Sequence, residues 1–196
     1  MIRLGNFNVV LDSCVLYDSL LRDLLLKIAE KELYQPIWSD EIFDEVKRNL
    51  IVRPNVTEEK VDRLLSVMKS AFPEAMCTSN SKSIELQNTN IDNKDKHVVS
   101  TAICSNAQVI ITNNLKHFPA DDLNSFTVEA QTPDQFLTNI WYLSYRLVID
   151  VYKDLEASYK NPPYPREQLL SMLEKRVPNF VNLLKPHLEE NIIYIH

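Results

Sequence analysis

The chain has 196 residues, of which only Gly5 is glycine, whereas the average usage of about 7% would give roughly 14 glycines. This scarcity excludes the glycine-rich loops that hold phosphates in dinucleotide-binding and Walker-type proteins, so a site here has to be built from side chains. The net charge of −6 and the pI of about 5.3 disfavour a broad phosphate-binding surface, which is normally basic. They do not exclude a nuclease whose carboxylates bind metal.

The cysteines and the apolar segments indicate the compartment. Cys14, Cys77 and Cys104 form no CxxC pair, and their number is odd. Such a pattern is typical of a reduced chain without a disulfide framework. The first residues lack a long apolar signal region, and no stretch approaches the roughly 20 apolar residues of a membrane helix. We therefore expect a cytoplasmic protein without a membrane segment.

The first two thirds of the chain alternate between short apolar runs and helical patterns. Apolar periodicity first predicts a buried strand at 7–11 and a helix over 15–30. Two more helices follow, one from Ser39 that Pro54 ends and one that begins at Thr57. A helix over 94–106 then precedes a strand at 109–112 and a third strand at 126–128. Residues 73–94 are polar and irregular. Alternation of this kind favours an α/β layer with a mostly parallel sheet.

The last third is helical. A long amphipathic helix is predicted from Thr132 to about Tyr159, followed by a rigid break at NPPYP and two shorter helices divided at Pro178. We therefore expect an α/β domain at residues 1–131 and a C-terminal all-helical extension at residues 132–196. The aromatic residues of the long helix are expected to pack against the α/β domain rather than to form a groove for a partner helix.

Polar residues follow two of the predicted strands. Asp12 and Ser13 come directly after the first strand, and Thr112, Asn113 and Asn114 end the second. Ligands of open parallel α/β sheets bind at the carboxyl ends of the strands, so these residues are candidates for a site. The structural alternative for Asp12 is that it only caps the next helix.

The segment IDNKDKHVVSTAI carries a second candidate. On a helical wheel Asp95 falls on the same side as Val98 and Ala102, which is unusual for an acid unless a cation meets it. The alternative is a capping box with Asp92 as the N-cap and Asp95 near the third helical position. His97 falls opposite the apolar stripe and is expected to be solvated.

The helix that begins at SDEIFDEV has four acids. Glu41 and Asp44 point away from its apolar stripe, whereas Asp40 and Glu45 flank the stripe. Periodicity does not choose between these last two, and acids in a first helical turn complement the helix dipole without any function.

Acids that converge at one sheet edge repel each other unless a hard divalent cation neutralises them. Mg²⁺ or Mn²⁺ prefers such oxygen ligands, and it would activate water and neutralise phosphate charge in phosphodiester hydrolysis. Other chemistry has less support, because the four histidines lack zinc spacing, no GxSxG motif is present and Cys14 has no partner base. Lys94, Lys96, Lys116 and His117 are near the proposed acids in the sequence and could hold a nucleic-acid backbone, but a solvated face is the better interpretation.

The order of these motifs is that of a known family. The strand that ends in Asp12, WSDEIFDEV with Glu45, DNKDKHVVSTAI with Asp92 and Asp95, VIITNNLKHFP and then TPDQFL follow one another along nearly the whole chain. This arrangement resembles the PIN-domain ribonucleases. Within them it is similar to the VapC-type toxins of bacterial type II toxin–antitoxin systems, in a subgroup with a C-terminal helical extension.

The resemblance implies a PIN fold with an acidic metal site. By position, Asp12, Glu45 and Asp95 match the catalytic, metal-binding acids, so the resemblance selects Glu45 over Asp40. The residues that would surround them are Asp92, Asn114, Thr112 and Ser13. Asn114 stands where many PIN domains have a fourth Asp, although Asn is usual in the subgroup that reads TxNLKxFP.

The function expected from the resemblance is that of a Mg²⁺- or Mn²⁺-dependent endoribonuclease. RNA is the expected substrate, a cognate antitoxin protein is the expected partner, and a homodimer is compatible with the family. The alternative is a degenerate PIN domain that binds RNA or a protein without cutting, for which Asn114 is the main argument. A receiver or phosphatase-like α/β protein is disfavoured, because the strand-end sequence DSC lacks the DxD spacing of haloacid-type phosphatases.

Overall fold

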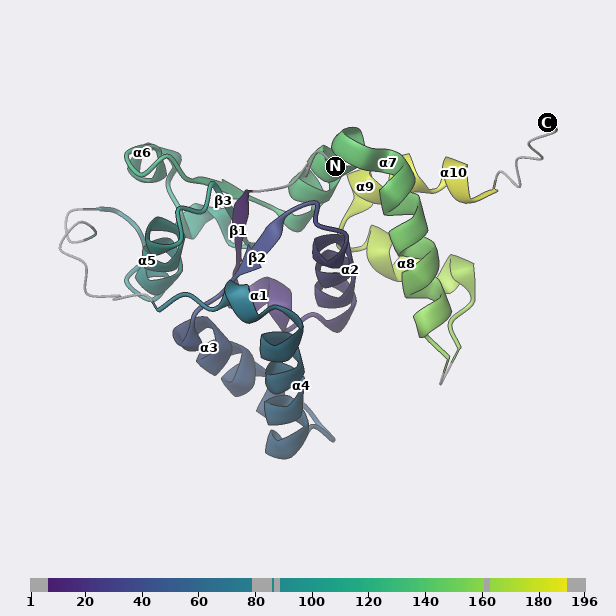
Figure 1. The fold of residues 1–196 in the computed structure, drawn as a ribbon, viewed down its shortest axis with the longest axis horizontal. Coiled ribbons are helices and arrows are strands. Elements are labelled where there is room, and N and C mark those ends of the chain that lie inside the picture. The colour runs from purple at the N-terminus through teal and green to yellow at the C-terminus, as the bar shows by residue number, and fades with distance from the viewer. Residues whose placement is uncertain (1–6, 79–85, 87–88, 161–162, 190–196) are drawn as a thin grey trace.

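A computed structural model describes residues 7–78, 86, 89–160 and 163–189. Its centre is a four-stranded sheet with strand order β2-β1-β3-β4, and all three strand pairs are parallel (Figure 1). The strands are β1 (Asn8–Leu11), β2 (Gln35–Ile37), β3 (Val109–Ile111) and β4 (Glu129–Gln131). The predicted α/β architecture with a parallel sheet is confirmed.

Helices surround this sheet. They are α1 (Ser13–Leu16), α2 (Ser19–Glu30), α3 (Asp40–Ile51), α4 (Glu58–Ala71), α5 (Lys96–Cys104) and α6 (Ala120–Asn124), with 3-10 turns η1 (Pro73–Ala75) and η3 (Leu115–His117). Helix α5 packs on β1 and β3, and α3 contacts both α1 and α5. Ser39 caps α3 by accepting the Ile42 N–H, as its place in the sequence predicts.

The sheet differs from expectation at two of its strands. Strand β2 was not predicted, because Pro36 at its middle argues against a strand; it is tolerated here since β2 is an edge strand. The last strand begins three residues later than expected, at Glu129. Thr127 has a φ of 56°, which no extended strand permits, so the predicted strand at 126–128 is wrong.

Two helix boundaries also differ from the prediction. The single helix expected over 15–30 is divided between α1 and α2, because the Asp18 carboxylate accepts the Leu20 and Leu21 N–H groups and starts a new helix. Helix α3 ends at Ile51, before Pro54 is reached.

The register of the central strands determines what lies at the sheet edge. Leu11 pairs with Ile111, and the Asp12 N–H donates to the Ile111 carbonyl over 3.1 Å. Both strands are almost wholly buried. Their first polar successors, Asp12 and Thr112, are therefore neighbours at the carboxyl edge of the sheet.

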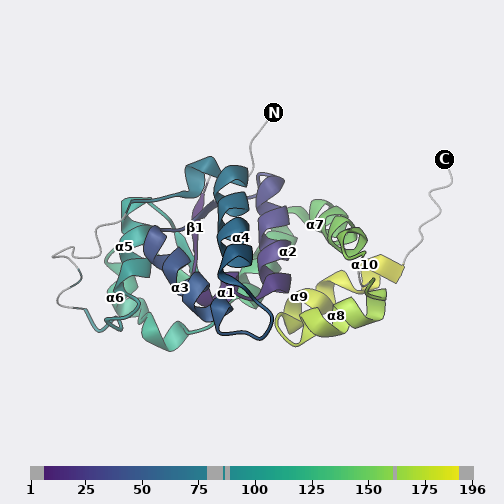
Figure 2. The same cartoon turned by 90° about the horizontal axis from the view of Figure 1, so that it is seen from below.

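The C-terminal helices form a second lobe beside the α/β part (Figure 2). They are α7 (Pro133–Ser158), α8 (Arg166–Glu174), α9 (Pro178–Leu184) and α10 (Pro186–Glu189). Thr132 and Gln135 form a capping box at the start of α7, and Ser144 interrupts its helical geometry. The long helix and the division at Pro178 are thus confirmed, whereas α10 was not predicted.

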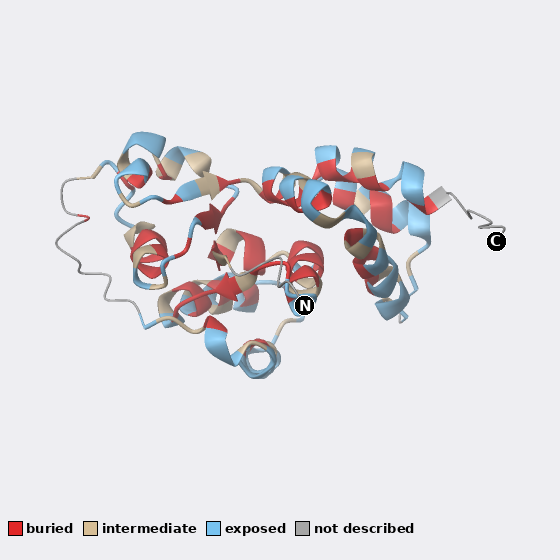
Figure 3. Cartoon of the chain, turned by 45° about the horizontal axis from the view of Figure 1, so that its top comes forward, coloured by how far each residue is buried: buried red, intermediate tan, exposed pale blue. Residues whose placement is uncertain are grey.

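The lobe packs on the α/β part through α7 and α2. Tyr159 donates to Asp23 over 3.1 Å, and Arg176 donates to Asp18 over 2.6 Å. Buried residues line the inner faces of both parts (Figure 3). In α7 Trp141 is buried, and its ring contacts Phe180 and His187 of the same lobe. Tyr142 is exposed, so the expected packing against the α/β domain is wrong for this residue. Within the described residues, no helix is long and apolar enough to cross a membrane.

Candidate active site

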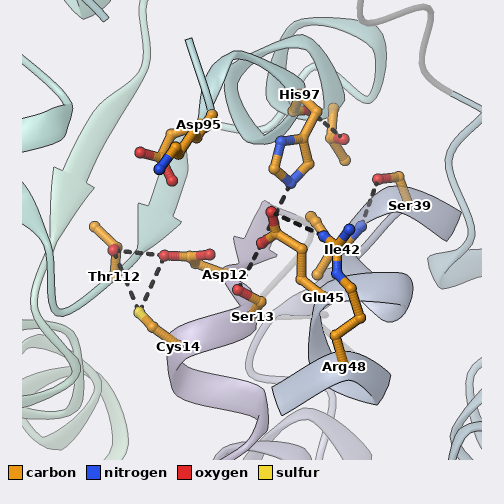
Figure 4. A network of polar contacts seen from close by, with 12 residues as sticks. Asp12, Ser13, Cys14, Ser39, Ile42, Glu45, Arg48, Asp95, His97 and Thr112 are labelled. Carbon is orange, nitrogen blue, oxygen red and sulfur yellow. Dashed lines mark hydrogen bonds and ion pairs between the residues drawn. The ribbon is translucent and has the colours of Figure 1, made fainter. Parts of the chain in front are cut away.

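Asp12 is at the centre of a polar network at the carboxyl edge of the sheet (Figure 4). Its Oδ2 accepts hydrogen bonds from Thr112 Oγ1 at 2.7 Å and from Cys14 Sγ at 3.0 Å. Asp12 occupies the N-cap position of α1, but its side chain makes no capping bond with a backbone N–H of that helix. The alternative that this carboxylate only caps a helix is therefore wrong. Asp12 is almost completely buried, so its charge needs partners.

Cys14 serves Asp12 as a hydrogen-bond donor. Burial and the neighbouring Asp12 carboxylate raise the pKa of this thiol to about 12, and the Asn113 N–H also donates to the sulfur. A thiol with such a pKa stays protonated near neutral pH, which excludes a nucleophilic role.

Glu45 reaches the same network from α3. Its Oε2 accepts from Ser13 Oγ at 2.8 Å and lies 3.6 Å from His97 Nε2, and Arg48 lies 3.7 Å from its other oxygen. Burial raises the pKa of Glu45, but His97 and Ser13 outweigh it, so the pKa falls below its usual value. Asp40 instead pairs with Lys69 at the surface.

His97 is a residue that the sequence interpretation missed. It is buried, not solvated as expected, because α5 has buried residues on every side. Its Nε2 makes no hydrogen bond among the described residues and faces Glu45 (Figure 4). Burial lowers the pKa of His97, but Glu45 raises it more. The signal was available, because the sequence of α5 is apolar or small nearly all round, as in a fully buried helix.

Asp95 lies at the start of α5, near Asp12 (Figure 4). It is the N-cap residue of α5, yet its carboxylate makes no capping bond. Its Oδ2 lies 2.9 Å from His117 Nδ1 instead. Asp92 Oδ1 accepts from the Lys94 N–H in a local turn. The alternative of a capping box with Asp92 as the N-cap is therefore wrong. His117, which was expected on a solvated face, is half-buried beside Asp95.

The electrostatics of Asp95 differ from those of Glu45. Burial raises the pKa of Asp95, the charges of Asp12 and Asp92 add to this, and His117 opposes it only in part. A raised pKa means that the folded protein disfavours the ionised carboxylate. On this side of the site, burial is the main reason why the ionised carboxylate is disfavoured.

A group with metal-binding potential follows from this arrangement. Ligand atoms of Asp92, Asp95 and His117 lie within 4.8 Å of one another, and among the residues with defined positions this is the group of acids and histidines that meets such a limit. Asp12 and Glu45 are not part of this group of three residues. Asn114 joins through its backbone, whose N–H donates to Thr112 Oγ1 over 3.0 Å. The donors are hard oxygens and one imidazole, which fits a divalent cation.

Comparison with known families identifies the class of protein. Residues 8–116, more than half of the chain, match the family described as "PIN domain". The chain belongs to the PIN domain family. Residues 133–186 match the family described as "VapC50 C-terminal domain". The resemblance to VapC-type PIN proteins with a C-terminal helical extension is thereby confirmed.

One curated relative makes the likeness more specific. Over 87 residues the chain is 38% identical to the protein named "Putative ribonuclease VapC50" of Mycobacterium tuberculosis (strain ATCC 25618 / H37Rv). The aligned part covers 44% of this chain and 52% of the relative, so the match spans about half the length of that protein. No solved structure matches the chain.

Proposed function

We propose that this protein is a Mg²⁺- or Mn²⁺-dependent endoribonuclease whose catalytic, metal-binding acids are Asp12, Glu45 and Asp95. The observation that carries the proposal is the meeting of Asp12 and Asp95 at one sheet edge, where the charge of Asp12 adds to the raised pKa of Asp95 (Figure 4). Membership of the PIN family and the ribonuclease name of the relative support RNA as the substrate. A bound divalent ion would supply an activated water and neutralise charge on the phosphodiester.

The surrounding residues would hold these acids in place. Thr112 donates to Asp12, and Ser13 donates to Glu45, so each carboxylate has one oxygen fixed by a hydroxyl. The Asn114 N–H orients the Thr112 hydroxyl. Partners of this kind set the orientation of metal ligands, and their loss commonly costs about 10- to 100-fold in affinity or activity.

The direct test is cleavage of single-stranded and structured RNA by the purified chain. With Mn²⁺ or Mg²⁺ we expect cleavage that EDTA abolishes and that Asp12→Asn lowers by on the order of 10³-fold. Asp40→Asn is the matched control, since it removes a carboxylate that pairs with Lys69 at the surface. We expect its activity to be close to that of the wild type.

Two other results would each exclude this mechanism. Cleavage that persists in EDTA and in Asp12→Asn would show that the acids are not needed. RNA binding without cleavage under all metal conditions would favour the degenerate PIN domain that Asn114 suggests.

The toxin role is a further part of the proposal. The relative's name and the C-terminal match support a VapC-type toxin, which implies a cognate antitoxin that covers the acidic site. Expression of the wild-type chain should slow bacterial growth, and Asp95→Asn should not. Equal growth of the two strains would count against toxicity. A small adjacent gene with a DNA-binding N-terminal segment would support the antitoxin.

We also propose that the chain consists of two parts with different roles. Residues 1–131 would form the nuclease domain, and residues 132–196 would form a helical extension that Arg176 and Tyr159 fix to it. A cytoplasmic location is consistent with the reduced cysteines and with the RNA substrate. A homodimer stays a hypothesis, which sedimentation of the purified chain would test.

A further inference from the structure

His117 is held next to two acids by the backbone of two separate segments. The Asp92 N–H donates to the His117 carbonyl over 3.4 Å, and the Asp95 N–H donates to the Asp92 carbonyl over 2.8 Å. The turn η3 is closed by the His117 N–H, which donates to the Asn114 carbonyl over 2.9 Å. The loop before α5 and the turn after β3 are thus tied together with their side chains facing each other.

The side chains in this position form a mixed set of donors. Two carboxylates and one imidazole offer ligand atoms within 4.8 Å of one another. Mg²⁺ prefers oxygen ligands, whereas imidazole is a preferred ligand of transition metals. An imidazole in the set would therefore shift the selectivity of the site.

We propose that His117 binds the catalytic ion together with Asp92 and Asp95, and that this makes the site prefer transition metal ions to Mg²⁺. The inference rests on the proposed function, because it concerns the ion of the same nuclease site. Many PIN domains carry a fourth acid at the position of Asn114, which is a neutral amide here. In this protein His117 would supply the ligand that this acid supplies elsewhere. The ring would bind in its neutral form, next to ionised carboxylates.

Other candidate ligands of similar softness are less suitable. His97 is buried and directed at Glu45, outside the group around Asp95. The Cys14 thiol stays protonated near neutral pH because its pKa is about 12, and only the thiolate binds metal. The half-buried His117 is therefore the soft donor that an ion at Asp95 would meet.

Calorimetric titration of the metal alone tests the proposal without RNA. Mg²⁺ and Co²⁺ are titrated separately into the full chain with Cys104→Ser, so that this exposed thiol does not bind Co²⁺. We expect Co²⁺ to bind at least about tenfold more tightly than Mg²⁺. His117→Gln should lower the affinity for Co²⁺ by about tenfold or more and change the affinity for Mg²⁺ by less than about threefold. His187→Gln, which removes an exposed imidazole from the C-terminal lobe, should change neither affinity.

A second measurement uses the protein without the His117 substitution. Co²⁺ is paramagnetic, so its binding should shift the His117 imidazole signals in the NMR spectrum far outside the normal range and leave those of His187 in place. The proposal is overturned if the Co²⁺ to Mg²⁺ affinity ratio is the same in His117→Gln, or if the His117 signals do not respond. If the wild-type chain prefers Co²⁺ to Mg²⁺ as expected but does not cleave RNA, the proposed nuclease function is refuted and the proposed metal selectivity is not.

Discussion

The two sides of the acidic site are built on opposite electrostatic principles. On one side Glu45 is surrounded by Ser13, His97 and Arg48, and its pKa is lowered. On the other side Asp95 lies 2.9 Å from His117 Nδ1, but burial, with the charges of Asp12 and Asp92 added to it, raises the pKa of Asp95. Both acids have a histidine neighbour, so the histidine alone does not explain the difference.

The difference shows where the site requires something from solution. The protein itself stabilises the charge of Glu45 through His97, Ser13 and Arg48. Burial opposes the ionisation of Asp95, the charges of Asp12 and Asp92 add to this, and a bound cation would favour the ionised carboxylate. We therefore expect a bound metal ion to stabilise the ionised form of Asp95 most, whereas Glu45 is held in its ionised form before the metal binds.

The largest expected effect comes from removing each acid in turn. Asp95→Asn should lower RNA cleavage by on the order of 10³-fold. It should also raise the urea midpoint of the protein in EDTA, because it removes a carboxylate whose ionisation burial and the charges of Asp12 and Asp92 disfavour. Glu45→Gln should lower that midpoint, because Ser13 and His97 lose their charged partner. Cleavage assays and urea unfolding in EDTA measure the two effects.

The opposite signs of the two stability changes are the decisive feature. If both substitutions destabilise the metal-free protein to the same extent, the two sides of the site are electrostatically alike and the comparison fails.

A smaller effect is expected from Ser13→Ala. The Ser13 hydroxyl donates to the Glu45 carboxylate over 2.8 Å in a half-buried position, and hydrogen bonds to charged groups contribute about 1.5–3 kcal/mol. We expect a loss of about 1.5 kcal/mol in the free energy of unfolding and a reduction of cleavage by about tenfold. Chemical denaturation and RNA cleavage measure both.

Ser125→Ala provides the control for this change. Its hydroxyl donates to the Asp122 carbonyl at an exposed position remote from the acids in sequence, so the loss should stay within about 0.5 kcal/mol. Equal losses in the two variants would mean that Ser13 has no special role toward Glu45.

The fold was predictable wherever the apolar pattern is continuous. Strands β1 and β3 are short runs of buried aliphatic residues, and the register that places Asp12 beside Thr112 follows from two such strands in parallel. Strand β2 was not predictable in this way, because Pro36 interrupts the pattern at a sheet edge that only the assembled fold defines.

The candidate site was predictable for its acids and not for its histidines. Periodicity left Asp40 and Glu45 equal, and the family resemblance chose Glu45, which the structure brings to Ser13 and His97. His97 was placed in solvent because a helical wheel ignores what packs on the second face of a buried helix. His117 meets Asp95 across 22 residues of sequence, a contact that no local pattern contains.

The smallest expected effect is the pH dependence of stability in the metal-free protein. Because the folded pKa of Glu45 is lowered from 4.5, its contribution is present above that value and is lost as the pH falls through the folded pKa. Because the folded pKa of His97 is raised from 6.5, its contribution is present below that value and is lost as the pH rises through the folded pKa.

The Glu45–His97 pair should therefore stabilise the protein most between these two usual values, 4.5 and 6.5. Asp95 acts in the opposite sense, because its folded pKa is raised from 3.8, so its ionisation costs stability as the pH rises through the folded pKa. Urea midpoints in EDTA at about pH 3.5, 5.5 and 8 test this. The advantage of the wild type over Glu45→Gln should be greatest at the middle pH, and an advantage that does not vary with pH would show that the pair contributes through packing instead of charge.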